Sequence, residues 1–300
     1  MEESDVLVVV VTYNSAAEIE PLLDGLPDAL GKLTYEVVVV DNGSTDATAA
    51  IIGARDDCEL VRSTNVGYAG GINRGVAAGR RSHAILVLNP DVEMEPGSVE
   101  VMMAALDLPG VGIVAPQIRD SDGSLQYTLG REPTLLRALG LGRLGHRLVS
   151  ERCVSDGEYV KGRPVDWALG AVLLVSRQCH DAVGGWDESY FLHSEETDLS
   201  LRARDRGWLT YYEPAARALH HGKRSGYNDR IHSMQIVNRV RLYSRRHGAA
   251  ASWTYYGLTV LSELSWLARG NDQSRASVQA LLRPGRRPAE IGCAGRLLPT

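Results

Sequence analysis

The chain has few cysteines and no long apolar run, and each of these shortages excludes a class of protein. The four cysteines lie at positions 58, 153, 179 and 293 with no C-x-x-C pair, which argues against a zinc cage or a disulfide framework. No apolar segment reaches the ~20 residues that a membrane-spanning helix needs. The start is acidic, with Glu2, Glu3 and Asp5, unlike the basic start of a secretory signal peptide. We therefore expect a cytoplasmic protein with reduced cysteines.

Two familiar nucleotide-binding motifs are also absent. A nicotinamide dehydrogenase carries G-x-G-x-x-G directly after its first strand, whereas the first predicted strand here runs into Thr12-Tyr13-Asn14. The glycine-rich segment at 65–75 follows the third predicted strand and lacks that spacing, and no Walker A motif occurs. The usual dinucleotide and P-loop interpretations are therefore excluded.

The charge of the chain is unevenly distributed along its length. Residues 1–100 contain 6 Lys/Arg and 17 Asp/Glu, whereas residues 201–300 contain 17 Lys/Arg and 6 Asp/Glu, within a net charge of −5 over 300 residues. The basic end either faces an anionic partner, such as phospholipid, nucleic acid or a phosphorylated acceptor, or matches the acidic part within the folded chain. Both interpretations stay open at this level.

Strand-like and helix-like segments alternate through the first 120 residues. Continuous valine runs, as in VLVVVVT and YEVVVVD, are typical of strands buried on both faces. The strands are expected at 6–12, 35–41, 60–62, 84–89 and 111–116, and the helices at 16–30, 46–54, 70–79 and 97–106. This alternation predicts an α/β fold with a mostly parallel sheet covered on both sides.

The second half of the sequence is less regular. Residues 117–165 are rich in glycine, arginine and turn-forming residues. The segments expected to be ordered are one or two strands in 165–176, a helix over 195–206, short strands at 210–213 and 216–220, and helices at 231–246 and 253–267. Beyond residue 284 we expect a disordered, Arg/Pro/Gly-rich end.

Polar clusters follow three of the predicted strands. They are Thr12-Tyr13-Asn14, Asp41-Asn42-Gly43-Ser44 and Asn89-Pro90-Asp91. Ligands of open α/β sheets bind just beyond the carboxyl ends of the strands, so the three clusters predict a single site. Asp41 could accept a hydrogen bond from a pyrimidine imide or a ribose hydroxyl. Its alternative role is to cap the next helix, but Asp46 fits the cap better.

Two further segments could bind phosphate and a metal ion, although each also has an ordinary structural explanation. Asn65–Gly75 combines glycines with two asparagines at a helix start, where unpaired N–H groups can meet a phosphate. As an isolated signal it is also an ordinary glycine-rich turn. Asp91 places a carboxylate at a strand end, as Mg²⁺ or Mn²⁺ prefers, but Asn-Pro-Asp is equally a common turn.

Acidic and histidine side chains gather in the second half. Ser194 to Asp198 open a predicted helix with three carboxylates, an arrangement that suits a general base but is also what a helix start prefers. Glu195 and Glu196 point about 100° apart on a helix of ~3.6 residues per turn, so they cannot both serve as the general base. His220 and His221 alternate across a strand, so at most one ring enters the site.

In this order, the segments resemble the family 2 glycosyltransferases of the GT-A fold, and in particular their bacterial rhamnosyltransferase branch. The matching motifs are VVTYN at 10–14, VDNGSTD at 40–46, N-x-G-x-A-x-G-x-N at 65–73, LNPDV at 88–92, GA-x-LLV at 170–175, GGWDE-x-YF at 184–191, EETDL at 195–199 and HH-x-x-x-S at 220–225. The resemblance implies a GT-A catalytic domain over 1–225, with a nucleotide-sugar half at 1–117 and an acceptor half at 165–225. A helical C-terminal extension at 226–283 and the tail at 284–300 would follow.

The resemblance also implies residue roles. Asp41 would hold the pyrimidine, Glu196 would be the general base, and Asp91 with His220 would bind Mg²⁺ or Mn²⁺. The other nucleotide-sugar positions would be Thr12, Tyr13, Asn14, Asn42, Gly43, Asn65, Gly67, Gly70, Asn73 and Asn89, with His221 a less favoured metal ligand. Trp167, Gly170, Trp186, Asp187, Glu195 and Asp198 would line the acceptor side.

Two positions depart from the family pattern. Asn89 stands where the metal-binding D-x-D motif has its first acid, which leaves one carboxylate instead of two. Glu196 stands where the branch usually has aspartate, so the reach of the proposed base differs.

The implied reaction is an inverting, metal-dependent transfer from a dTDP- or UDP-sugar, typically dTDP-β-L-rhamnose. The acceptor would be a glycan or a polyprenyl-diphosphate-linked sugar of cell-wall or surface polysaccharide. The basic C-terminal helices, which carry Trp and Tyr, would fit peripheral contact with the anionic inner face of the cell membrane. Alternatively, they would pack on the catalytic domain or form a homodimer. No nucleic-acid partner is expected. Alternatives are a sugar-1-phosphate nucleotidyltransferase, which would need a glycine- and basic-rich loop after the first strand, and a sugar-nucleotide-binding protein without turnover.

Overall fold

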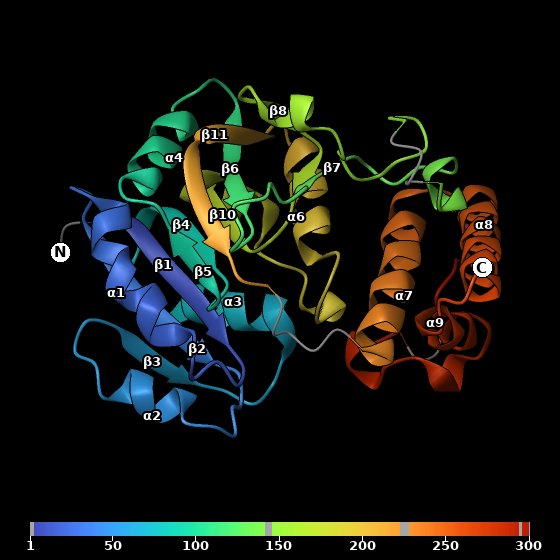
Figure 1. Cartoon of the computed structure of the whole chain (residues 1–300), viewed down its shortest axis with the longest axis horizontal. Coiled ribbons are helices and arrows are strands. Elements are labelled where there is room, and N and C mark those ends of the chain that lie inside the picture. The colour runs from blue at the N-terminus through green and yellow to red at the C-terminus, as the bar shows by residue number, and fades with distance from the viewer. Residues whose placement is uncertain (1–2, 142–145, 223–227, 294–295, 300) are drawn as a thin grey trace.

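An α/β part and a group of C-terminal helices lie side by side in the molecule (Figure 1). The structure is a computed structural model that describes residues 3–141, 146–222, 228–293 and 296–299. The proposed domain boundary at residue 225, and Ser225 of the histidine motif, lie outside the described residues.

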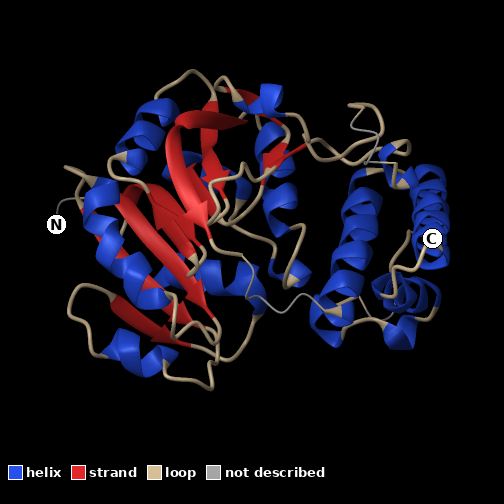
Figure 2. Ribbon diagram, viewed as in Figure 1, coloured by secondary structure: helices blue, strands red, loops and turns tan. Residues whose placement is uncertain are grey.

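A mixed sheet forms the centre of the α/β part (Figure 2). Its strands are β1 (Ser4–Thr12), β2 (Tyr35–Asp41), β3 (Glu59–Arg62), β4 (Ser82–Leu88), β5 (Val92–Met94), β6 (Val111–Arg119), β8 (Arg163–Val165), β10 (Val172–Ser176) and β11 (Leu209–His220). The order is β3-β2-β1-β4-β10-β6-β11-β5, with β8 paired to β11. Strands β1 to β4 are parallel, as predicted, whereas β10 is antiparallel to both of its neighbours. A small antiparallel pair, β7 (Leu129–Gly130) and β9 (Trp167–Ala168), lies apart from this sheet.

Helices cover both faces of the sheet. They are α1 (Ile19–Leu30), α2 (Thr48–Gly53), α3 (Gly67–Ala78), α4 (Ser98–Leu106), α5 (Arg177–Val183) and α6 (Glu195–Arg204). Alternate valines of β1 enter two different cores: Val8 packs in the cluster of α1 and α4, and Val9 in the cluster of α3 and α6. This explains why the strand is a continuous apolar run rather than an alternating one.

Strand β11 differs from the sequence expectation. Two short strands were expected at 210–213 and 216–220, but the structure has one strand with a register shift between Glu213 and Arg217. Pro214 lies inside this shift, and proline cannot donate to the ladder. The irregularity lets the strand continue to His220, which pairs with Val92 of β5.

Three helices form the C-terminal group. They are α7 (Asp229–Arg246), α8 (Ala249–Ala268) and α9 (Gln273–Leu282), of which α9 has no counterpart among the predicted helices. Their own core includes Ile236, Val240, Tyr243 and Tyr255. None of the helices in the described ranges combines the length and apolar character needed to cross a bilayer.

The expectation of a disordered tail from residue 284 is wrong for much of its described part. Residues 284–286 and 289–291 form short 3-10 turns, and Ile291, Cys293 and Leu297 are buried in the C-terminal core. Arg287 donates hydrogen bonds to the carbonyls of Ala280 and Cys293, both at 3.1 Å. Apolar burial and these bonds order a segment whose composition alone indicated disorder.

A crossing segment, whose described residues are 131–141 and 146–162, connects β7 with β8 and reaches the C-terminal helices (Figure 1). It contains the 3-10 turn η1 (Arg137–Leu139), which packs against α8. Gly140 lies so close to this helix that an added Cβ would sit 2.1 Å from the Ser262 hydroxyl. The segment therefore ties the two parts of the molecule together.

Arginines of α7 are paired within the chain. Arg245 forms an ion pair with Asp187 at 2.5 Å, and Arg246 with Asp205 at 2.8 Å. For these two arginines, the structure therefore supports the intramolecular interpretation of the basic end over an external anionic partner.

Candidate active site

The carboxyl ends of β1, β2 and β4 meet at one edge of the sheet. Thr12 is in register with Asp41, and Val10 with Leu88, the residue before Asn89. The backbone N–H of Asn42 donates to the Thr12 carbonyl at 2.9 Å. The three polar clusters thus surround one edge, as expected for parallel strands.

The loops after β1 and β2 are bonded to each other. Asn14, at φ 54°, accepts a hydrogen bond from Thr45 N–H at 2.8 Å and donates its own N–H to the Ser44 hydroxyl at 2.9 Å. Asp46 accepts the N–H of Thr48, the first residue of α2, at 3.0 Å, whereas Asp41 accepts the N–H of Ser44 in the loop before the helix at 3.3 Å. Tyr13 is 53% exposed beside these loops.

The start of α3 is held by two asparagines. Asn42 accepts the N–H of Val66 at 3.1 Å and donates to the carbonyl of Gly67 at 2.9 Å. Asn65 accepts the N–H of Gly67 at 3.1 Å. Gly67 has φ +80°, and an added Cβ would lie 2.3 Å from the Phe191 carbonyl. A glycine is therefore required where this helix start meets the loop before α6.

The predicted donor residues differ in how close they lie to the strand ends. Gly43, at φ +87°, turns the chain immediately after Asp41 and Asn42. Asn73 instead exchanges hydrogen bonds with the backbone of Trp186, at 2.8 and 3.1 Å. Gly70 likewise packs toward Glu188. The structure gives the last two residues a packing role, and their contact with a donor stays a prediction.

Asp91 and His220 face each other. His220 Nε2 lies 3.3 Å from Asp91 Oδ1 and 3.5 Å from Asn89 Nδ2. Burial alone would raise the pKa of Asp91, but the hydrogen bond and charge of His220 lower it below its ordinary value. His221 pairs with Glu93 at 2.9 Å instead, which favours His220 as the ring available to Asp91.

The donor set around Asp91 suits a divalent ion with open coordination positions. No group of three or more His, Cys, Asp or Glu side chains that could hold a metal occurs among the described residues. Mg²⁺ commonly uses one or two protein carboxylates and completes its shell with water and substrate phosphates. One carboxylate, one imidazole and the amide of Asn89 therefore fit such an ion without forming a closed cage.

Glu195 and Glu196 form a buried acidic pair in the first turn of α6. Burial raises the pKa of both carboxyls above the ordinary value, and the charge of Glu196 adds to the rise at Glu195. Gly170 lies against Glu196, since an added Cβ would be 3.4 Å from the Glu196 Cβ. A buried carboxyl of raised pKa is poised to accept a proton near neutral pH.

Tyr68 and Arg152, which the sequence motifs did not single out, connect the two acidic groups. The Tyr68 hydroxyl donates to the Gly170 carbonyl at 3.0 Å. Its pKa is raised by burial and by the charges of Glu195, Glu196 and Asp91, so its hydroxyl is within electrostatic reach of both the acidic pair and Asp91. The positive charge of Arg152 partly offsets the rise in the pKa of Glu196.

The loop before α6 has unusual backbone geometry. Phe191, His193 and Ser194 have φ of 62°, 68° and 75°, a region that residues other than glycine seldom adopt. Fully buried Asn238 of α7 donates its amide to the carbonyls of Tyr190, Leu192 and His193, at 2.7, 3.0 and 3.1 Å. No local sequence signal identifies this contact, because it joins segments more than 40 residues apart.

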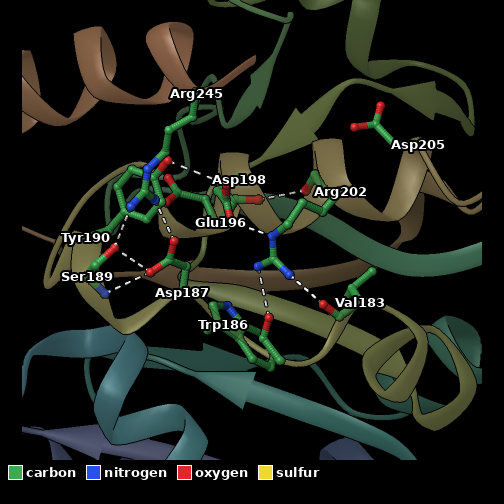
Figure 3. A network of polar contacts seen from close by, with 12 residues as sticks. Val183, Trp186, Asp187, Ser189, Tyr190, Glu196, Asp198, Arg202, Asp205 and Arg245 are labelled. Carbon is green, nitrogen blue, oxygen red and sulfur yellow. Dashed lines mark hydrogen bonds and ion pairs between the residues drawn. The ribbon is translucent and has the colours of Figure 1, made fainter. Parts of the chain in front are cut away.

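Several predicted acceptor-side residues belong to a structural network (Figure 3). Asp187 pairs with Arg245, and Asp198 accepts a 2.6 Å bond from Arg202. Trp186 is 3% exposed and lies in the core on the α3 and α6 face of the sheet. These three positions therefore hold the α6 region together, and their contact with an acceptor stays a prediction.

Trp167 and Gly170, in contrast, lie beside the acidic pair. Trp167 is in β9, which packs against α6, and its indole N–H donates to the Arg131 carbonyl at 2.9 Å. The guanidinium of Arg152 stacks over this ring, 5.3 Å from its centroid.

Known sequences similar to this chain include a family profile and curated relatives. Residues 7–148 match the profile described as glycosyl transferase family 2. A Mycobacterium tuberculosis protein, "N-acetylglucosaminyl-diphospho-decaprenol L-rhamnosyltransferase", is 34% identical over 286 residues, covering 86% of this chain and 92% of its own. "Rhamnosyltransferase WbbL" of Escherichia coli is 25% identical over 261 residues, covering 81% and 96%.

Solved structures with the same fold include two that contain Mn²⁺ and a nucleotide or nucleotide sugar. The complex of GalNAc-T7 with UDP, GalNAc and Mn²⁺ has a TM-score of 0.63 at 14% identity, covering 99% of this chain and 59% of its own. A Pyrobaculum calidifontis mannosyltransferase with GDP-Man and Mn²⁺ has a TM-score of 0.55 at 16% identity, covering 98% and 84%. At such low identity these likenesses establish the architecture alone.

Proposed function

The chain belongs to glycosyl transferase family 2 and is a glycosyltransferase of the GT-A fold, and from this premise we propose that it transfers L-rhamnose from dTDP-β-L-rhamnose to a lipid-linked glycan. The activities of the two rhamnosyltransferase relatives support rhamnose as the sugar, and that of the mycobacterial relative supports a lipid-linked acceptor. The observation that carries a transfer reaction is that buried Glu196 packs against Gly170, whose carbonyl accepts the hydroxyl of Tyr68, and that the charge of Asp91 acts on the same tyrosine. Family membership also disfavours the nucleotidyltransferase alternative.

The donor would lie along the edge of the sheet. Asp41 would accept the imide N–H of the pyrimidine, and the positive end of the α3 dipole would face the diphosphate. Thr12 to Asn14 and Asn42 would complete this side. The bonds of Asn42 to Val66 and Gly67 support a preorganised helix start.

Asp91 and His220 would hold Mg²⁺ or Mn²⁺, with Asn89 beside them. When bound, the ion offsets the negative charge that develops on the leaving nucleoside diphosphate. The Mn²⁺ present in two solved structures of this architecture supports the assignment, as does the incomplete protein donor set around Asp91.

Glu196 would act as the general base of a single displacement. Its carboxylate takes the proton of the acceptor hydroxyl, whose oxygen forms a bond to the anomeric carbon. The bond between that carbon and the diphosphate oxygen breaks, and the electron pair leaves with dTDP. Attack from the opposite face inverts the anomeric centre and gives an α-L-rhamnoside. The raised pKa of Glu196 supports this role, because a base of raised pKa holds the proton more strongly.

Peripheral membrane contact is a further part of the proposal. Helix α8 exposes Trp253, Leu261 and Leu264, which lie close to one stripe at helical spacing. Replacing the three by serine should reduce sedimentation with anionic liposomes. Unchanged sedimentation would show that this stripe does not bind membrane.

The substitution Glu196→Gln tests the function. We expect donor binding, measured by calorimetry with dTDP-rhamnose, to be kept, and transfer to fall by about 10²–10⁴-fold, the usual contribution of a general base. Glu20→Gln is the matched control, because Glu20 lies in the first turn of α1 and is exposed. Transfer that survives in Glu196→Gln would refute Glu196 as the base. Binding of a UDP- or GDP-sugar in place of dTDP-rhamnose would refute the donor.

A further inference from the structure

A cavity of about 550 Å³ lies between the crossing segment and the C-terminal helices. Its lining includes Arg137 of η1, Glu151 and Arg152 of the crossing segment, Arg239 of α7 and Trp266 of α8. The lining thus carries three arginines and one glutamate, and its net charge is positive. None of the sequence motifs points to this place.

Two guanidinium groups of the cavity have an unused donor. The Nε atoms of Arg137 and Arg239 are buried and have no hydrogen-bond partner among the described residues. The other nitrogens of these side chains are engaged: Arg239 pairs with Glu151 at 2.5 Å, and Arg137 donates to the Arg147 carbonyl at 3.0 Å. A buried donor without an acceptor costs free energy, and an anion in the cavity would remove that cost.

The charge of Arg137 is also incompletely compensated. Burial lowers the pKa of its guanidinium below the ordinary value, by more than the nearby charges of Asp166 and Glu151 raise it. A phosphate oxygen is a natural partner of such a group, because an N–H of a charged guanidinium bonds more strongly to an anionic oxygen than to a neutral one.

One wall of the cavity connects it with the acidic pair of α6. Arg152 lines the cavity and stacks on Trp167, and its charge also lowers the pKa of Glu196. A ligand whose charged group lies against Arg152 can therefore present its next sugar toward Glu196.

We infer that this cavity binds the diphosphate of a lipid-linked acceptor through Arg137, Arg152 and Arg239, with the acceptor sugar directed toward Glu196. The inference rests on the proposed function and adds the subsite that recognises the acceptor. Exposed leucines at 136, 139 and 148 flank the lining residues Arg137, Gly140 and Val149 along the chain. They provide an apolar path for the lipid beyond the diphosphate, which favours a lipid diphosphate over free inorganic phosphate.

The first experiment compares two synthetic acceptors that differ only in the charged group. One is N-acetylglucosamine joined through a diphosphate to a short alkyl chain, and the other is the alkyl glycoside without phosphate. For Arg137→Gln we expect KM for the diphosphate acceptor to rise about tenfold or more, the effect of losing a charge-assisted hydrogen bond, and KM for the glycoside to rise much less. Arg137→Lys keeps the positive charge but lacks the Nε donor of the guanidinium, so its KM for the diphosphate acceptor should lie between those of wild type and Arg137→Gln.

Arg275→Gln is the matched control, because Arg275 is an exposed arginine of α9 whose side chain is 67% exposed. It removes the same charge from the chain and should leave both KM values unchanged. An equal rise for both acceptors in Arg137→Gln, or no rise in either Arg137 variant, would overturn the inference.

A binding measurement separates this inference from the proposed function. A fluorescent form of the diphosphate lipid is titrated into the full-length protein, with inorganic pyrophosphate as a competitor. If no rhamnose is transferred but the lipid binds and Arg137→Gln weakens it, the cavity assignment stands and the transfer assignment falls. If the protein binds the diphosphate lipid no better than the phosphate-free lipid, or if pyrophosphate alone binds as tightly as the lipid, the inference is wrong.

Discussion

Asn238 is predicted to position the loop before α6, which leads to the proposed base Glu196, from a helix outside the α/β part. Its amide nitrogen lies 2.7 to 3.1 Å from three carbonyl oxygens of residues 190–193. A hydrogen bond contributes about 0.5–1.5 kcal/mol net, and a buried group left without its partner costs about 1–3 kcal/mol. Replacing Asn238 by alanine should therefore cost about 2–4 kcal/mol at this loop.

That cost is comparable to the strain that the loop contains. Phe191, His193 and Ser194 have positive φ, and each such residue costs roughly 1–3 kcal/mol. Without Asn238 the loop can relax toward ordinary backbone angles, and Glu195 and Glu196, which follow directly, would move with it. A displacement of about 1 Å at a reacting group can cost about 10²-fold in rate.

The assay is steady-state kinetics with the donor and acceptor varied separately. For Asn238→Ala we expect kcat to fall about 10–100-fold, with a smaller change in donor affinity, because the donor side is held by bonds of Asn42 that Asn238 does not make. Asn228→Ala is the control. Asn228 caps the same helix through the N–H groups of Arg230 and Ile231, and its loss should cost about 1 kcal/mol of stability without lowering kcat.

If Asn238→Ala keeps kcat within about twofold of wild type while its Tm falls as far as that of Asn228→Ala, the amide is only a stabilising contact and positions nothing. The isosteric change Asn238→Asp should lower kcat as well, because a carboxylate offers no N–H to the three carbonyls.

The remaining predictions concern the acidic pair, the proposed metal ligand Asp91 and the glycine at the start of α3. Because burial raises the pKa of Glu195 in the folded state, stability falls as pH rises above the unfolded-state value, so Glu195→Gln should raise Tm at pH 8 more than at pH 5; equal shifts at both pH values would contradict this. Asp91→Asn should weaken Mn²⁺ binding in the presence of dTDP, measured by electron paramagnetic resonance, by about tenfold or more, whereas His221→Ala should not. Gly67→Ala should lower Tm more than Gly184→Ala, since both glycines have φ near +80° but only at Gly67 would a Cβ meet backbone; equal losses would show that conformation alone decides.

The first half of the fold could be predicted because its signals are local. The valine runs of β1 and β2 and the polar residues that end them follow from burial on two faces and from the ligand edge of a parallel sheet. The expected positions of α1 to α4 agree with the structure to within three residues at either end.

The second half could not be predicted to the same degree, because its order comes from contacts distant in sequence. Asn73 and Trp186 bond to each other across 113 residues. Arg152 and Trp167 approach from the crossing segment and β9, and the tail is ordered by a core that three helices build. The motifs pointed to the acidic pair and to Asp91 and His220. Residue type alone could not distinguish Asp187 and Asp198, which form ion pairs, from side chains that face a ligand.

The charge asymmetry of the sequence also has a physical explanation in the structure. Among the described residues, the ion pairs of α7 join its arginines to Glu132, Glu151, Asp187, Asp205 and Glu290, none of which belongs to the acidic first hundred residues. The surplus of negative charge therefore stays on the half that is proposed to bind a nucleoside diphosphate. Like charges repel, so the proposed donor would bind there more readily together with a compensating cation. The single carboxylate of Asp91 is consistent with this expectation, because a second acid at position 89 would add to the repulsion whenever the ion is absent.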